Sequence, residues 1–198
     1  MRISRLISSV ALATALATSS AQALNLIVNE GFETGDFTGW TTGANSFPMS
    51  IVTSPVESGI YAAQIAGFSN NPDTLSQTVA DTAGQSYVLS FSRYVNDGAP
   101  TVSLNVSWNG NSVFSELNPA TVDIYQTFAL NVVGSGSDAL IFTSANDPST
   151  TYLDNVSLTP TATTPLPSTW LMLLSGFVGL GFFAYRGTTK RTAVLAAA

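Results

Sequence analysis

Residues 101–114 read TVSLNVSWNGNSVF, and this stretch indicates the fold class. Apolar residues alternate with small polar ones from Thr101 to Trp108, which is the period of a β-strand with one buried face. Asn109-Gly110 follows, and this pair is preferred in the two-residue type I′ turn of a β-hairpin. Because residues 112–114 can return as a second strand, the stretch predicts an antiparallel hairpin.

The same alternation recurs on both sides of this hairpin, between clusters of Gly, Asn, Asp and Pro. In residues 87–95, for example, Ser90 and Ser92 lie opposite an apolar face. No segment between residues 24 and 160 holds a long helical period. Eight or nine short strands of this kind predict an all-β domain, a single jelly-roll β-sandwich over residues 24–158. The other predicted strands are 24–28, 47–52, 61–66, 75–79, 87–95, 124–133, 139–144 and 151–158.

The first 23 residues differ in composition from this domain. Arg2 and Arg5 precede an apolar run over residues 6–17, and Ala21-Gln22-Ala23 follows. A basic start, a short apolar core and an Ala-x-Ala site are typical of a secretory signal peptide. We therefore predict cleavage after Ala23. The alternative is a retained membrane anchor, for which the apolar run is short.

The C-terminal part contains a second apolar run. Residues 170–185 (WLMLLSGFVGLGFFAY) carry no charge, and three basic residues follow. Because positive charge stays on the cytoplasmic side, we expect a transmembrane helix with the preceding residues outside. The alternative is a buried core helix. Residues 159–164 are predicted to form a Thr/Pro linker, and residues 192–198 a disordered tail.

Charge and residue types exclude several classes of function. Arg93 is the one basic residue between 24 and 160, whereas all twelve acidic residues of the chain lie there. Such a domain repels nucleic acid and attracts cations such as Ca²⁺. The chain has no cysteine and no histidine. Disulfides, Ser-His-Asp and Cys-His nucleophilic sites and the usual zinc sites are therefore excluded.

Two stretches carry a family resemblance. Residues 29–40 (NEGFETGDFTGW) and 152–158 (YLDNVSL), with Ser58-Gly59 and residues 62–65 between them, resemble the galactose-binding-like jelly rolls, the architecture of many bacterial carbohydrate-binding modules. In that family the first and last strands share a calcium ion. The resemblance implies that Glu33 and Asp154 supply carboxylates, and that backbone carbonyls near Asn29 and Ser58 complete the shell.

Two alternatives to this calcium site stay open. Glu33 and Asp154 could be ordinary surface acids, and Glu30 or Asp36 could take the place of Glu33. The chemistry favours the ion, because Ca²⁺ binds six to eight oxygen atoms and prefers carboxylates mixed with carbonyls.

The C-terminal residues 165–191 resemble the PEP-CTERM sorting signal. The matching residues are the motif Pro165-Leu166-Pro167, Trp170 at the start of the apolar run, and the basic residues Arg186, Lys190 and Arg191. Leu166 stands where the family carries Glu. The resemblance implies recognition by exosortase, a membrane transpeptidase. The protein would then stay only transiently in the inner membrane before release to the cell surface or extracellular matrix.

Four residues are candidates for contact with a sugar. Tyr94 and Tyr125 could offer aromatic faces, and Arg93 could hold an acidic sugar or pair with a nearby carboxylate. Trp108 could also offer a face, although its place on the apolar side of a strand favours core packing.

These observations together predict a binding or structural protein and not an enzyme. We expect an exported, calcium-stabilised jelly roll that binds or organises polysaccharide. One alternative is a small glycoside hydrolase or lyase that uses paired carboxylates. Another is a structural surface adhesin that binds protein.

Overall fold

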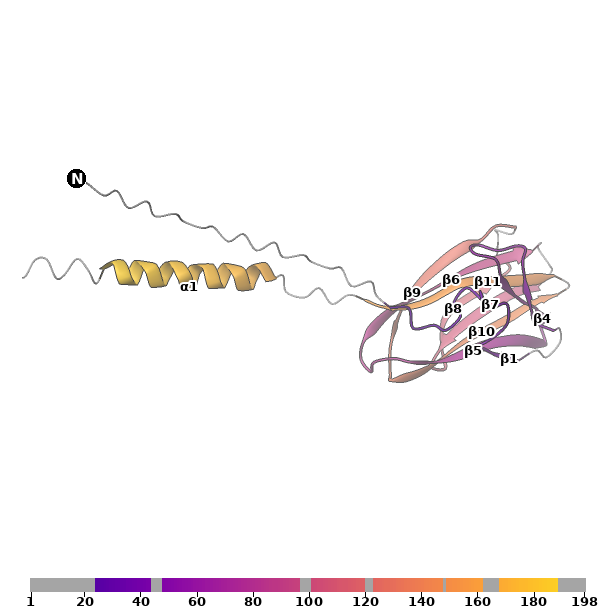
Figure 1. Cartoon of the computed structure of the whole chain (residues 1–198). Helices are drawn as coiled ribbons and strands as arrows, with labels where there is room; N and C mark the ends of the chain where they lie inside the picture. The colour runs from indigo at the N-terminus through magenta and orange to yellow at the C-terminus, as the bar shows by residue number, and fades with distance from the viewer. Residues whose placement is uncertain are drawn as a thin grey trace, which may run out of the picture.

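The computed structural model describes residues 24–43, 48–96, 101–119, 123–147, 149–161 and 168–188. Two antiparallel sheets pack face to face in a β-sandwich (Figure 1). The predicted all-β fold and its β-sandwich architecture are therefore confirmed. The predicted signal peptide, residues 1–23, lies outside the described residues.

The larger sheet has the strand order β1-β5-β10-β7-β8, and β4 pairs with β5. Most of its strands were predicted, but the two shortest, β1 and β4, have no alternating pattern of their own and were missed. The strands are β1 (Thr41–Gly43), β4 (Gly67–Phe68), β5 (Asn71–Ala80), β7 (Thr101–Trp108), β8 (Asn111–Leu117) and β10 (Ser137–Asp147).

The hairpin between β7 and β8 forms as the sequence indicates. Trp108 pairs with Asn111 across the turn. The φ angles are 49° at Asn109 and 79° at Gly110. A type I′ turn requires positive φ at both central residues, which Asn and Gly adopt at the lowest cost.

The smaller sheet has the order β2-β3-β11-β6-β9, so the last strand of the domain lies at its centre. β11 also extends to Pro160, beyond the predicted domain end at residue 158, and takes in the start of the predicted linker. Residues 162–164 of that linker lie outside the described residues. The strands are β2 (Ser50–Val52), β3 (Ala62–Ile65), β6 (Ser86–Asn96), β9 (Gln126–Val133) and β11 (Thr150–Pro160).

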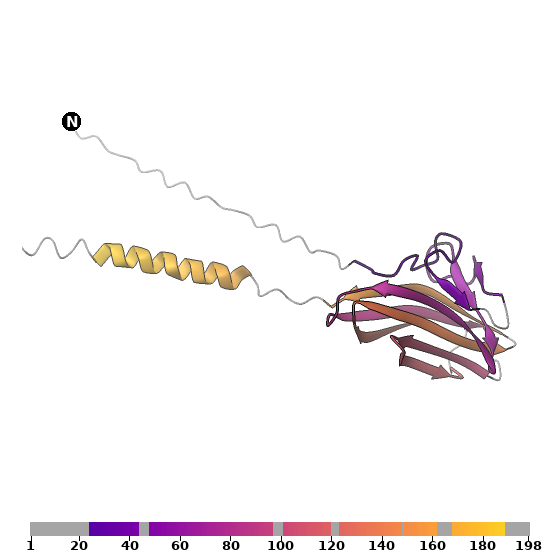
Figure 2. The same ribbon diagram turned by 90° about the horizontal axis from the view of Figure 1, so that it is seen from below.

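Residues 24–40 run along one edge of the sandwich without forming a strand (Figure 2). The strand predicted at 24–28 is therefore wrong. The backbone of residues 24–28 forms hydrogen bonds with both sheets. Leu26 N donates to Leu158 O of β11 at 3.0 Å, whereas Val28 exchanges two bonds with the Gln77 side chain of β5. A segment that bridges two sheets cannot hold a regular ladder with either one.

The core lies between the sheets and includes residues from this edge segment. Phe32 is fully buried, and its ring centroid lies 5.6 Å from that of Trp40. Trp40 in turn lies 6.2 Å from Phe142 of β10, and Phe142 lies 5.3 Å from Phe91 of β6. The aromatic residues therefore connect the edge segment to both sheets.

A single helix, α1 (Ser168–Thr188), follows the domain and contains the predicted helical segment 170–185. In the described part of the chain no helix is both long and apolar enough to cross a membrane, so the predicted transmembrane span is not borne out. Small and polar residues such as Ser175, Gly176, Gly179 and Gly181 interrupt its apolar sequence.

The predicted sorting signal is only partly covered by the structure. Trp170 and Arg186 fall within α1. The tail 192–198 and the motif residues Pro165, Leu166, Pro167, Lys190 and Arg191 lie outside the described residues.

Candidate functional site

The first and last parts of the domain meet where residues 26–30 pair with residues 156–158 of β11. Val156 N donates to Glu30 O at 2.9 Å, next to the bond between Leu26 and Leu158. This backbone pairing brings the loop that carries Glu33 against the strand that carries Asp154. The two carboxylates that the family resemblance singles out therefore come from adjacent segments.

A β-bulge shapes β11 at this point. The register of β11 against β6 shifts between Asp154 and Ser157, and Asn155 has a φ of 51°. A bulge bends a strand locally and redirects its side chains. As a result, two consecutive side chains contact the loop at residues 53–61: Asp154 bonds its backbone, and the Ser58 hydroxyl donates to Asn155 Oδ1 at 2.7 Å.

Asp154 is fully buried and anchors this loop. Its Oδ2 accepts hydrogen bonds from the amides of Glu57 at 2.9 Å and Ser58 at 3.1 Å, and its Oδ1 accepts one from Asn155 N at 2.7 Å. Burial raises the pKa of the Asp154 carboxyl. The three amides act in the opposite direction, and the charge of Glu33 adds to the increase.

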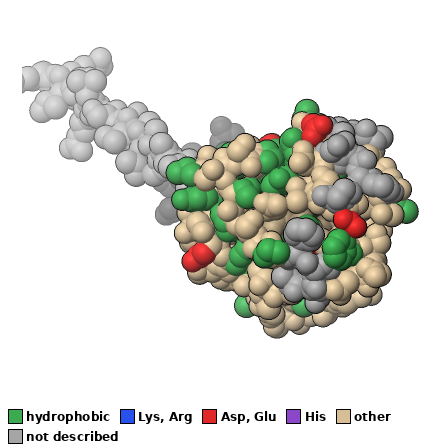
Figure 3. Space-filling view, turned by 90° about the vertical axis from the view of Figure 1, so that its right-hand side faces the viewer, with side chains coloured by type: hydrophobic (Ala, Val, Ile, Leu, Met, Phe, Trp, Pro, Cys, Tyr) green, Lys and Arg blue, Asp and Glu red, His purple; other side chains and the backbone are tan. Residues whose placement is uncertain are grey.

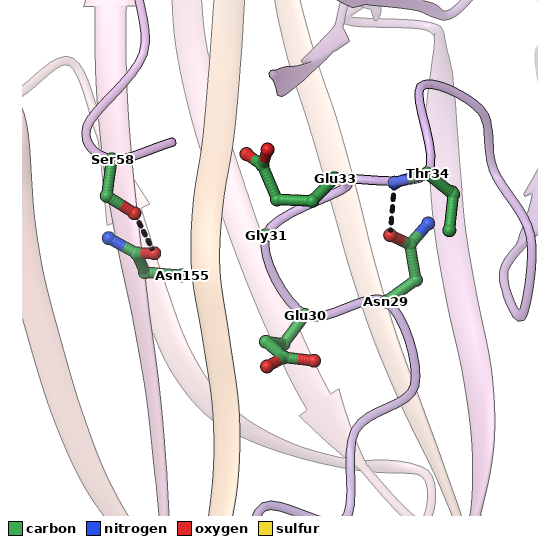
Figure 4. A pocket seen from close by; sticks show the side chains of 7 residues that line it. All are labelled: Asn29, Glu30, Gly31, Glu33, Thr34, Ser58 and Asn155. Atoms are coloured by element: carbon green, nitrogen blue, oxygen red, sulfur yellow. Dashed lines mark hydrogen bonds between the residues drawn. The ribbon is translucent and has the colours of Figure 1, made fainter. Parts of the chain in front are cut away.

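Glu33 holds the next part of the same loop. Its Oε1 accepts hydrogen bonds from Ile60 N at 3.0 Å and Tyr61 N at 3.1 Å. Gly31 lies between the two acids, because a Cβ built there would be 3.5 Å from Glu33 Cγ and 3.6 Å from Asp154 Oδ1. Figure 4 shows Gly31 on the loop beside Glu33, with the Asn155 side chain directed toward Ser58.

Asn29 has a structural role in the neighbouring loop. Its side-chain amide donates to the carbonyls of Asp36 at 3.0 Å and Thr38 at 3.2 Å, and its Oδ1 accepts from Thr34 N at 3.2 Å. Its backbone carbonyl accepts from Phe32 N and from Trp40 Nε1, each at 3.2 Å. Asn29 therefore closes the 29–40 loop, and both its polar groups are engaged within it.

A cavity of about 470 Å³ opens between these segments. Its side chains supply oxygen donors without sulfur or imidazole, which is the donor set that Ca²⁺ prefers. Within the described residues, no group of three or more acidic, histidine or cysteine side chains gathers. Of the two predicted calcium carboxylates, Glu33 lines this cavity and Asp154 does not. The lining residues are Asn29, Glu30, Gly31, Glu33, Thr34, Ser58 and Asn155.

A second hollow of about 340 Å³ lies on the outer face of the smaller sheet and shares Glu30 and Asn155 with the first. Hydroxyl groups form its floor: Ser90 bonds Ser157 at 2.7 Å, and Ser92 bonds Thr127 at 3.0 Å. We call it the hydroxyl groove. Its lining residues are Glu30, Glu57, Ser90, Ser92, Thr127, Asn155, Val156 and Ser157.

Three tyrosines adjoin the hydroxyl groove on the same face. Tyr94 and Tyr152 are cross-strand partners, in the row next to the pair formed by Ser92 and Asp154. The Tyr94 ring lies 5.3 Å from Tyr125 and 5.7 Å from Tyr152. Tyr125 also donates from its hydroxyl to Pro55 O at 3.0 Å, which ties the tyrosines to the 53–61 loop. Burial raises the pKa of Tyr125.

The structure brings two of the four predicted sugar contacts together, Tyr94 and Tyr125. Trp108 is 4% exposed and donates from its indole nitrogen to Val133 O at 2.9 Å, so it belongs to the core. Arg93 is 1% exposed and forms an ion pair with Glu116 at 3.1 Å. Neither side chain is accessible to a sugar.

Sequence reasoning missed Tyr152 and the groove residues. The alternation in residues 87–95 does place Ser90 and Ser92 opposite the apolar face. However, the pattern carries no signal that strands β6, β9 and β11 would line up their hydroxyls beside a loop.

No protein-family model matches the sequence, and no curated protein matches it. Solved structures with a similar fold include TmCBM61 in complex with β-1,4-galactotriose. It has 21% identity and a TM-score of 0.55, over 70% of this chain and 100% of that one. The CBM22-1 xylan-binding domain from Paenibacillus barcinonensis has 17% identity and a TM-score of 0.54, over 71% of this chain and 97% of that one.

A cyclase from Fischerella sp. TAU, in complex with an indolyl butanone, has the same fold. It is 17% identical with a TM-score of 0.54, over 72% of this chain and 100% of that one. The chain therefore has the jelly-roll fold found in carbohydrate-binding modules. Since a cyclase has this fold too, the fold alone does not define an activity.

Proposed function

We propose that this domain binds polysaccharide along the outer face of the smaller sheet, at the hydroxyl groove and its tyrosines. The observation that carries the proposal is that the hydroxyl groove and the tyrosine rings lie side by side on one face of the smaller sheet. Tyrosine rings can stack on the apolar faces of sugar rings. The hydroxyls of Tyr94 and Tyr125 bond Asp123 and Pro55, so the rings supply the apolar part of the contact. A row of serine and threonine hydroxyls beside them can both donate and accept hydrogen bonds.

The similar fold of two carbohydrate-binding modules supports this proposal. The test is affinity electrophoresis and calorimetry with the purified domain on a panel of polysaccharides that includes β-1,4-galactan and xylan. We expect retention of at least one polymer. Tyr94→Ala should weaken binding about tenfold or more, which corresponds to about 1.4 kcal/mol.

Asn105→Ala is the matched control for this experiment. Asn105 pairs with Thr143 and Ser115 on the outer face of the larger sheet, away from the groove. The control should bind like the wild type. Absence of retention on every polymer, or equal loss in both variants, would contradict the proposed site.

The proposal includes a calcium ion held by Glu33 and Asp154. The buried charge of Asp154 beside Glu33, and a cavity lined by oxygen atoms, support it. When bound, the ion would neutralise the two acids. Glu33 and Asp154 accept hydrogen bonds from the backbone of residues 57–61. Because Glu57 lines the hydroxyl groove, these bonds also position one wall of the groove.

The localisation that we propose is extracellular or at the cell surface. It rests on the basic, apolar and Ala-x-Ala pattern of residues 1–23, with sorting at residues 165–191 as a further prediction from the sequence. Mass spectrometry of the exported protein should find Leu24 as its first residue.

The catalytic alternative is tested in the same samples. A hydrolase or lyase would release reducing or unsaturated sugars from the polymer that the domain binds. We expect no product after prolonged incubation. Product formation by the wild type that is lost in a folded Glu33→Gln variant would favour the enzyme.

A further inference from the structure

The walls of the hydroxyl groove carry negative charge. Glu30 and Glu57 line the groove directly. Asp154 lies beneath the same loop, with Glu57 N bonded to its Oδ2. A fourth carboxylate borders the tyrosines, because the Tyr94 hydroxyl donates to Asp123 Oδ1 at 3.3 Å. A chain lying in this groove therefore meets acidic groups on both of its sides.

No positive charge balances these acids on the described surface. Among residues whose side chains the structure describes, Arg93 is the one basic residue, and it is 1% exposed. It lies on the inner face of β6, where it pairs with Glu116 of β8. The face shown in Figure 3 carries acidic side chains, and none of its described side chains is lysine or arginine.

We infer that the groove selects neutral polysaccharides and rejects anionic ones such as polyuronates. This inference rests on the proposed polysaccharide site and names its ligand class. The hydroxyls of a neutral sugar can donate to the carboxylates of Glu30 and Glu57, and bonds to a charged acceptor are stronger than neutral ones. A sugar carboxylate cannot donate such bonds, and at low salt it is repelled by the exposed charges of Glu30 and Glu57.

The experiment compares each neutral polymer with a derivative of it that carries negative charge, and the salt dependence isolates the effect of that charge. β-1,4-Galactan and xylan are each used before and after partial carboxymethylation, with calorimetry at low salt and in 0.5 M NaCl. We expect carboxymethylation to weaken wild-type binding about tenfold or more at low salt. The difference should shrink at high salt, because exposed charges are then screened.

Charge-neutral variants test the groove residues themselves. A Glu30→Gln/Glu57→Gln variant keeps side chains that can form hydrogen bonds and removes the two charges. It should bind the neutral polymers more weakly than the wild type, because an amide is a weaker acceptor than a carboxylate, and the penalty for the carboxymethylated form should fall to about twofold. Asp147→Asn, which removes one negative charge at the exposed end of β10, should leave the penalty unchanged.

The outcomes separate this inference from the proposed function. Equal binding of neutral and anionic polymers by the wild type, or stronger binding of the anionic form, overturns the inference and leaves the polysaccharide site standing. Loss of all binding overturns both. The series is repeated with chelator and with 2 mM CaCl₂. Calcium that brings the anionic polymer to the affinity of the neutral one also overturns the inference.

Discussion

Asp154 is a buried acid that accepts three backbone hydrogen bonds, from Glu57, Ser58 and Asn155. These three bonds offset the desolvation cost of burying the carboxylate, and two of them also order the 53–61 loop. The carboxylate also lies near that of Glu33, whose charge raises its pKa further. At the scale of single residues, the stability of the contact between β11 and the 53–61 loop depends on how the charge of Asp154 is neutralised.

Asp154→Ala should therefore destabilise the domain. The change leaves amides at the loop without their acceptor, and each buried unsatisfied group costs about 1–3 kcal/mol. We expect a loss of about 2–3 kcal/mol in the free energy of unfolding, measured with urea in the presence of chelator. Asp154→Asn keeps one acceptor and should lose less. Equal stability of wild type and Asp154→Ala would contradict the anchoring role.

Calcium should stabilise the wild type in a pH-dependent way. The folded-state pKa of Asp154 is raised above 3.8, so the folded chain binds this proton more tightly than the unfolded chain. Without the ion, stability contributed by this group is therefore lost as pH rises above 3.8 through the raised pKa. Calcium requires the carboxylate form, so its stabilising effect should appear over the same range and vanish as pH falls.

The measurement is the melting temperature with 2 mM CaCl₂ and with chelator, at pH values from 3.5 to 7.5. The difference between the two conditions should be largest at neutral pH. A Glu33→Gln/Asp154→Asn variant should show little difference at any pH. A calcium effect of the same size in that variant would place the ion elsewhere.

At the scale of elements, Arg93 and Glu116 connect the two sheets at the edge opposite the N-terminal segment. Arg93 belongs to β6 and Glu116 to β8, and the guanidinium also lies 5.5 Å from the centroid of the Phe128 ring of β9. Burial lowers the pKa of Arg93, and the charge of Glu116 opposes this. Arg93 is therefore a buried charge, and its partner on the other sheet, Glu116, is 25% exposed.

Removal of one partner should be costly. Glu116→Ala leaves a buried guanidinium without its counter-charge, and such changes cost about 3–5 kcal/mol. The double variant Arg93→Met/Glu116→Leu replaces the pair with apolar groups and should recover most of that loss. Urea denaturation of both variants checks the pattern. Additive losses in the double variant would show that the two side chains act independently.

The β7–β8 turn is a second element whose stability can be tested. Gly110→Ala forces a side chain into a φ of 79°, and we expect a loss of about 1 kcal/mol in the free energy of unfolding. Asn109→Gly is the control, because glycine also accepts positive φ, and it should change stability by about 0.5 kcal/mol or less. Thermal melts of both variants would suffice. Equal effects would contradict a type I′ turn.

At the scale of the whole molecule, residues 24–40 complete the core without joining either sheet as a strand. Ile27, Phe32 and Trp40 are 4%, 0% and 7% exposed. Burying an aromatic or branched aliphatic side chain contributes about 1.5–3 kcal/mol. The combined contribution is comparable to the whole stability of a typical domain, about 5–15 kcal/mol.

A fragment of residues 24–161 should therefore fold, and one of residues 41–161 should not. Circular dichroism during heating should show a cooperative transition only for the longer fragment. Dispersed amide signals in a proton–nitrogen correlation spectrum would provide the second readout. A cooperative transition in the shorter fragment would show that the edge segment is dispensable for the core.

The sequence alone determined the hairpin turn and the longer strands, although not the short strands β1 and β4 or the edge segment at 24–28. The alternation in residues 101–108 and the Asn109-Gly110 pair are local properties, since side-chain direction repeats every two residues and positive φ favours these residue types. Only the tertiary structure decided which residues are accessible. Arg93 and Trp108 face the interior, the partly exposed Tyr94 and Tyr125 pack against the buried Tyr152, and the bulge in β11 sets Asp154 under its loop. These placements depend on the register between strands that are distant in the sequence. That register brings the side chains together, and no local sequence pattern encodes it.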